Sequence, residues 1–192
     1  MAKHRSRHRG FTLVELMVTL AVIAILAMIA VPNFGSLTRR HRVASVANEL
    51  LADFTYARAE AATRGKYVSI CASSDGATCS ESADYASGWI VYAYPTGGKG
   101  ANQLYDGSKA DFALLRATGT QPGVAIAALD AAPFTYGQQG EARRDSFGLI
   151  VCSRPSSGAQ AENSAAVPGI KVGLIGSGSV ALGPLPSGSN CS

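Results

Sequence analysis

The first pattern in the sequence is an almost unbroken apolar run over residues 11–31, FTLVELMVTLAVIAILAMIAV, in which Glu15 is the one ionisable residue. As an α-helix this run would be about 32 Å long, because each residue adds about 1.5 Å. That length is enough to cross the hydrocarbon core of a bilayer. We therefore predict a transmembrane helix over residues 11–31, preceded by a basic segment at residues 1–10.

Helical periodicity continues after Pro32 and Gly35, which we expect to interrupt and kink the apolar helix. Apolar residues then recur at three- and four-residue spacing and predict one buried face, consisting of Val43, Val46, Ala47, Leu50, Phe54, Ala57 and Ala61. Polar residues, among them Glu49 and Asp53, are assigned to the opposite face. Gly65 is a plausible C-terminal stop. Residues 32–64 are thus predicted as an amphipathic continuation of one long helix.

From residue 65 onward the pattern changes to short β-rich stretches separated by Gly, Pro, Ser and Asn clusters. Strands are predicted at 67–72, 89–94, 112–117, 123–129, 134–136, 147–153, 169–175 and 179–182. The polar connections at 96–109 and 153–169 are expected to be mobile. Residues 65–192 therefore read as one β-rich head, and with 47% apolar residues the chain can bury a core.

The net charge of +4 suggests an anion-binding protein until its position is considered. Lys3, Arg5, Arg7 and Arg9 supply four of the 17 basic residues, so the other 13 balance the 13 acidic residues. If the first ten residues are removed during maturation, the remaining chain is formally neutral.

Glu15 distinguishes the apolar segment from an ordinary signal peptide or a plain signal anchor. A carboxylate in a membrane helix costs about 2 to 3 kcal/mol at mid-bilayer, so it requires a partner or a function. A cut after Gly10 would give Phe11 a free α-amine, with Glu15 one helical turn away. In a helical assembly, that carboxylate could neutralise the amine of a neighbouring subunit.

Residues 10–16, GFTLVEL, resemble the processing site of type IV pilins and of type II secretion pseudopilins. The resemblance implies that residues 1–10 are a leader peptide, which a prepilin peptidase cleaves between Gly10 and Phe11. It also implies N-methylation of Phe11 and a role for Glu15 in the axial register of the filament.

The head resembles the GspH/FimT family, which includes FimT- and FimU-like minor pilins and the H pseudopilin of type II secretion. The likeness rests on the order of five features: ARAEAATRGKYVSICA at 57–72, the loop that contains Cys79, GWIVYAY at 88–94, FTYGQQGEA at 134–142 and FGLIVCS at 147–153. It implies an α+β type IV pilin fold, with a long N-terminal helix packed on a β-rich head. The head would be periplasmic, on a single-pass inner-membrane protein that later enters a pilus or pseudopilus.

Four cysteines, Cys71, Cys79, Cys152 and Cys191, all follow the apolar segment. In an exported head, an even number of cysteines indicates disulfides, and four cysteines permit three pairings. We favour Cys71 with Cys79 and Cys152 with Cys191, which would close a short loop and hold the C-terminal tail.

No arrangement of residues in the head indicates metal binding or nucleophilic catalysis. It lacks a C-x-x-C pair, and the histidines, His4, His8 and His41, all precede it. We therefore expect no cofactor, no metal and no enzymatic activity.

The favoured function is that of a FimT/FimU-like minor pilin, a structural and assembly subunit of a type IV pilus. Its expected partners are the prepilin peptidase, other pilins or pseudopilins of the same filament, the inner-membrane assembly platform, and the lipid bilayer before assembly. The first alternative is an H-type minor pseudopilin of a type II secretion system.

A second alternative is DNA binding during DNA uptake, with Arg143, Arg144 and Arg154 as weak contacts. It is not favoured, because residues 176–182, GSGSVAL, stand where the family has a Gly-Arg-x-Arg type of segment and carry no arginine. The basic group Arg39, Arg40, His41 and Arg42 reads as a solvated collar or as a contact with lipid phosphates.

Overall fold

The computed structural model describes residues 11–97, 100–156, 158–176 and 178–191, and the side chains of residues 29–33 lie outside this description. The chain divides into two units, Met1–Leu37 and Thr38–Ser192. The helix α1 spans Leu13–Arg64 and is 52 residues long. It continues through Pro32 and Gly35, so the predicted interruption there is wrong. It ends at Arg64, where Gly65 takes a positive φ of 59° that favours glycine.

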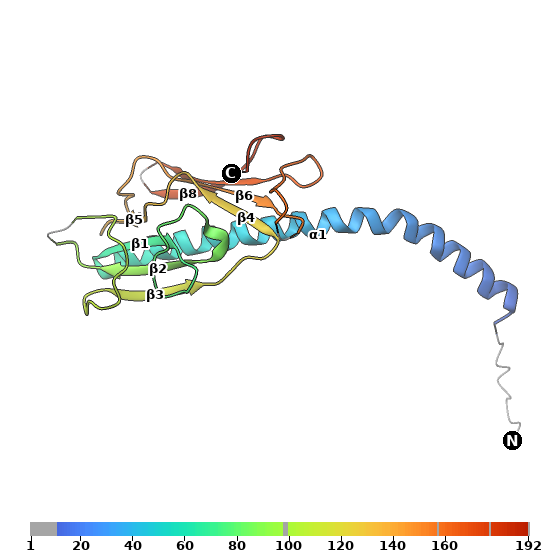
Figure 1. Cartoon of the computed structure of the whole chain (residues 1–192), viewed down its shortest axis with the longest axis horizontal. Coiled ribbons are helices and arrows are strands. Elements are labelled where there is room, and N and C mark those ends of the chain that lie inside the picture. The colour runs from blue at the N-terminus through green and yellow to red at the C-terminus, as the bar shows by residue number, and fades with distance from the viewer. Residues whose placement is uncertain (1–10, 98–99, 157, 177, 192) are drawn as a thin grey trace, which may run out of the picture. The chain divides into compact units, whose positions relative to one another are not determined.

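The second unit contains two antiparallel sheets of four strands each (Figure 1). The strands are β1 (Tyr67–Ala72), β2 (Trp89–Tyr94), β3 (Ala113–Thr118), β4 (Val124–Ala128), β5 (Phe134–Tyr136), β6 (Gly148–Ser153), β7 (Ile170–Ile175) and β8 (Ser179–Pro184). The first sheet has the order β3-β2-β1-β5, and the second has the order β4-β6-β7-β8. A short 3-10 helix, η1 (Tyr85–Ser87), precedes β2. All eight predicted strands are confirmed, and the fold is the predicted α+β arrangement of a helix packed on a β-rich head.

The core of the head lies between both sheets and the part of α1 that follows residue 42. All seven residues predicted for the buried helix face are between 0% and 5% exposed. Phe54 lies at the centre, with its ring centroid 5.5 Å from that of Phe134 in β5 and 5.0 Å from that of Phe147 beside β6. One helix face therefore contacts both sheets at once, which explains its strict three- and four-residue spacing.

Asp53 lies in this interface and not on the polar face, so its assignment from the sequence is wrong. It is 2% exposed, and its carboxylate accepts hydrogen bonds from Trp89 Nε1 at 2.7 Å and from Thr118 Oγ1 at 3.2 Å. Arg116 of β3 forms an ion pair with it and stacks on the ring of Tyr56, 4.2 Å from its centroid. The buried charge is thus stabilised by three donors, which fix α1 against β2 and β3.

The described residues of the 96–109 connection make hydrogen bonds to the first sheet. Three buried hydroxyls beneath it form a network in which Ser69 Oγ lies 3.0 Å from Tyr94 Oη and 2.6 Å from Thr135 Oγ1. The backbone N–H of Asn102 donates to Thr135 and that of Gln103 donates to Tyr94. Hydroxyls inside the sheet thus replace the backbone partners that this connection lacks.

The described residues of the 153–169 connection are likewise anchored. Asn163 accepts a hydrogen bond from the N–H of Gly169 at 2.9 Å and donates to the carbonyl of Pro186 at 2.6 Å. Arg39 forms an ion pair with Glu162, and Arg40 donates to the carbonyl oxygens of residues 165 and 166. Arg39 and Arg40 of the basic collar are therefore bound to the head itself.

Candidate functional site

The start of α1 carries the residues that the sequence singles out for assembly. The Oγ1 atom of Thr12 accepts a hydrogen bond from the backbone N–H of Glu15 at 3.2 Å, and the Thr12 carbonyl accepts one from Leu16. Thr12 is therefore the N-cap, and Glu15 lies in the first turn, where free N–H groups favour a carboxylate. Phe11 is 83% exposed. The predicted cleavage residue Gly10 lies outside the described residues.

The first unit exposes an apolar surface. Its large apolar side chains between residues 13 and 28 are 50% to 78% exposed, and they are Leu13, Val14, Leu16, Met17, Val18, Leu20, Val22, Ile23, Ile25, Leu26 and Met28. Within the residues that the structure describes, no helix is both long enough and apolar enough to span a membrane. The transmembrane assignment of residues 11–31 stays a prediction.

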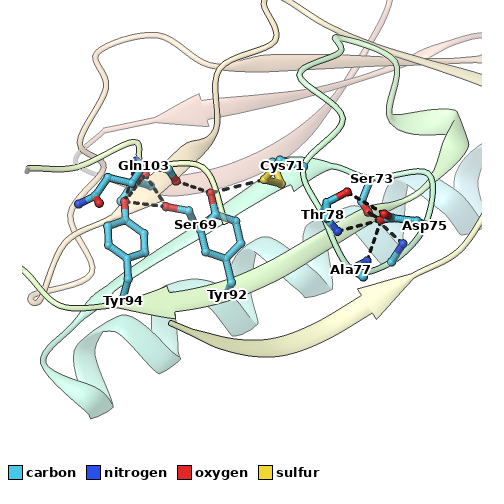
Figure 2. Close-up of a disulfide and its surroundings, with 12 residues drawn as sticks. Ser69, Cys71, Ser73, Asp75, Ala77, Thr78, Tyr92, Tyr94 and Gln103 are labelled. Carbon is cyan, nitrogen blue, oxygen red and sulfur yellow. Dashed lines mark hydrogen bonds between the residues drawn. A yellow bond between two sulfur atoms is a disulfide. The ribbon is translucent and has the colours of Figure 1, made fainter. Parts of the chain in front are cut away.

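Two disulfides link the four cysteines in the favoured pairs. The loop disulfide, Cys71–Cys79, joins the end of β1 to a turn whose centre is Asp75 (Figure 2). The Asp75 carboxylate accepts hydrogen bonds from the backbone N–H groups of Ala77 and Thr78, both at 2.8 Å, and from two hydroxyls. These donors hold the pKa of Asp75 well below its usual range.

The tail disulfide, Cys152–Cys191, ties the C-terminal tail to β6. Its two cysteines are separated by 39 residues in the sequence, and both are buried together with Leu185. The loop disulfide is packed as well, since the Tyr92 hydroxyl lies 3.8 Å from Cys79 Sγ and donates to the carbonyl of Gln103 at 2.6 Å (Figure 2). Both bridges are therefore parts of the packed head.

The arginines considered for DNA binding do not form one free basic patch. Arg143 pairs with Glu141 and lies over the ring of Tyr67. Arg144 pairs with Asp130, and its hydrogen bonds lower the pKa of that carboxyl. Of these three arginines, only Arg154 has no carboxylate partner within the described part of the chain. Among the described residues, no group of His, Cys, Asp and Glu is arranged to hold a metal ion.

The family described as "Type II transport protein GspH" matches residues 46–167, which is more than half of the chain, and the chain belongs to this family. The motif described as "Prokaryotic N-terminal methylation motif" matches residues 5–31.

Individual curated relatives match only a part of this chain. The chain is 36% identical over 67 residues to the type IV major pilin protein PilA of Myxococcus xanthus, which is 35% of this chain and 30% of PilA. It is 44% identical over 45 residues to the type IV major fimbrial protein FimA of Dichelobacter nodosus, which is 23% of this chain and 29% of FimA. The matches thus span less than a third of the length of these curated relatives.

A solved structure matches over most of the chain. The crystal structure of the type IV minor pilin FimU of Pseudomonas aeruginosa matches with a TM-score of 0.51 and 20% identity, covering 81% of this chain and 99% of that one. At this identity the match shows the fold, which is the type IV pilin fold.

Proposed function

We propose that this protein is a minor pilin, a structural subunit that is assembled into a type IV pilus. The observation that carries the proposal is the N-terminal segment, in which a methylation motif leads into a helix with an exposed apolar surface and one carboxylate in its first turn. An apolar surface of this extent requires a partner, either lipid or other helices. The proposed activity is assembly, and no catalytic step is part of it.

The proposed maturation begins with cleavage between Gly10 and Phe11 by a prepilin peptidase, followed by N-methylation of Phe11. Cleavage removes the basic leader and creates a positive α-amine one helical turn from Glu15. Before assembly, residues 11–31 would anchor the chain in the inner membrane, with the head in the periplasm. On the assembly platform these residues would then leave the lipid and pack among the helices of other pilins.

Glu15 is proposed to set the axial register of the subunit. A carboxylate among apolar helices is costly unless it is paired, and the α-amine at Phe11 of a neighbouring subunit is a fitting partner. A shift of the helix by one residue would separate the two charges by about 1.5 Å. The charge pair would therefore select one position, while apolar packing supplies the attraction.

The test is filament incorporation of a Glu15→Ala subunit in its native host. We expect the variant to be processed and to accumulate in the membrane, but to be largely absent from sheared filaments on immunoblots. Asp145→Ala, which removes an exposed acid from the head, is the matched control and should be incorporated normally. Normal incorporation of Glu15→Ala would rule out the register role. Mass spectrometry of the purified subunit tests the processing step, because cleavage and methylation predict a chain that starts at a methylated Phe11.

A second candidate function is that of an H-type pseudopilin in type II secretion, because the matching family carries that description. Deletion of the gene separates the two functions. Loss of surface pili with normal protein export supports the minor pilin. Retention of exported enzymes in the periplasm with normal pili supports the pseudopilin.

A further inference from the structure

The side chains of two arginines of the head have no hydrogen-bond or ion-pair partner within the described residues, and they line the same pocket. They are Arg42 of α1 and Arg154, which follows β6. Every other arginine side chain from residue 38 onward has an ion-pair or hydrogen-bond partner, although Arg39 has only its ion pair with Glu162 and its Nε makes no hydrogen bond; the others are Arg40, Arg58, Arg64, Arg116, Arg143 and Arg144. The two exceptions therefore set this pocket apart from the rest of the head.

Gly123 brings the two arginines together. Its carbonyl accepts a hydrogen bond from the backbone N–H of Arg154 at 3.0 Å, while the side chain of Arg42 lies against its Cα. A Cβ at residue 123 would lie 2.3 Å from a terminal nitrogen of Arg42, so glycine leaves the room that this guanidinium occupies. The pocket has a volume of about 450 Å³, which is within the range of small-ligand sites.

The Nε atom of Arg154 is buried and has no hydrogen-bond partner in the described part of the structure. An unpaired buried donor costs free energy, and a donor on a charged group costs more than a neutral one. A ligand oxygen that reached this atom would remove this cost, and Arg154 lines both this pocket and a second one beside Cys191.

The charges around the pocket favour an anion. Asp84 is the acid in its lining, and its carboxylate accepts the N–H of Ala86 at 2.9 Å. An adjoining groove shares Arg42 and contains His41 and Glu49, whose carboxylate is bonded by Gln121. The pocket itself thus presents two guanidinium groups and one carboxylate, so it carries an excess of positive charge.

We propose that this pocket binds a phosphate group. Two guanidinium forks can donate several parallel hydrogen bonds to the oxygens of a phosphate, and their charge matches its one to two negative charges. The hydroxyl of Ser156 in the lining is a further donor. The phosphate can belong to a soluble compound or to the headgroup of an anionic phospholipid, because both present the same group. This binding function is additional to filament assembly and does not depend on it.

The test is isothermal titration of the full chain, in a sugar-based detergent and phosphate-free buffer, with inorganic phosphate. Arg42→Gln and Arg154→Gln should each weaken binding by about tenfold or more, because each removes charge-assisted hydrogen bonds. Arg143→Gln, which removes an arginine already paired with Glu141, is the matched control and should bind as the wild type does. Absence of phosphate binding by the wild type, or unchanged affinity in both pocket variants, would overturn the proposal.

Two additional measurements complete the design. Phosphate should raise the melting temperature of the wild type and leave that of the pocket variants unchanged, which shows that the variants fold and fail only in binding. Competition against bound inorganic phosphate then shows whether the phosphate group belongs to a lipid or to a soluble compound. If short-chain phosphatidylglycerol displaces inorganic phosphate at a lower concentration than glycerol 3-phosphate does, the natural ligand is a lipid headgroup. If glycerol 3-phosphate displaces it at the lower concentration, the natural ligand is a soluble compound.

Discussion

The buried carboxylate of Asp53 gives a sharp test of how the helix is held on the head. In Asp53→Ala, the indole N–H of Trp89 loses its acceptor in a fully buried position, which costs about 1 to 3 kcal/mol. The ion pair with Arg116 adds less, at about 0 to 1 kcal/mol, because the Arg116 side chain is 44% exposed and water can replace the carboxylate. The expected loss is therefore about 3 kcal/mol.

The assay is thermal unfolding of the full chain in detergent, followed by circular dichroism. For a chain of this length, about 1 kcal/mol shifts the melting temperature by roughly 2 to 4 °C, so Asp53→Ala should melt about 6 to 12 °C lower. Asp53→Asn should lose less stability than Asp53→Ala, because its amide oxygen can still accept a hydrogen bond from Trp89. It should still be less stable than the wild type, because its NH2 group then faces the other donors.

Glu60→Ala is the matched control for Asp53→Ala. Glu60 lies on the same helix and also pairs with an arginine, Arg64, but that pair is near the surface. Loss of this ion pair in Glu60→Ala should lower the melting temperature by no more than about 2 °C. If Asp53→Ala melts as close to the wild type as Glu60→Ala does, then the buried network does not fix the helix, and the reasoning is refuted.

Two further predictions concern the disulfides and acid stability. Replacing both cysteines of the tail disulfide by serine should cost about 4 kcal/mol, against about 2.5 kcal/mol for the loop disulfide, because the tail disulfide closes the longer loop; equal losses in thermal unfolding would contradict this order. The lowered pKa of Asp130 means that its ion pair stabilises the fold above about pH 4, the usual aspartate range, and that this contribution is lost as the pH falls through the folded-state pKa. The melting temperature should therefore fall on acidification below pH 4, and less steeply in Asp130→Asn.

The helix and strands were predictable because their signals are local. Val43 to Ala61 repeat with helical spacing on one face, and segments such as 89–94 are short apolar runs between turn residues, so neighbouring positions already determine the element. The cysteine pairs were one favoured choice among three, because they close a short loop and hold the C-terminal tail, and the structure has this pairing. The methylation motif at the N-terminus was predictable because its residues are continuous in the sequence.

The polar contacts inside the head were not predictable in this way. Asp53 follows the polar spacing of the helix, and its donors Trp89, Arg116 and Thr118 are 36, 63 and 65 residues away in the sequence. Pairing over such separations depends on which strands become neighbours, and no local pattern encodes that. The same holds for Arg42 and Arg154, which meet at Gly123 only once α1 and β4 are packed.

The three buried hydroxyls of Ser69, Tyr94 and Thr135 have a consequence for local opening of the head. They come from β1, β2 and β5, and they hold the amide hydrogens of Asn102 and Gln103. Those amides can meet solvent only when their hydrogen bonds to Thr135 and Tyr94 break. Although they belong to a connection without helix or strand, their amide hydrogens should therefore exchange with deuterium more slowly than amides of the same connection that donate no hydrogen bond.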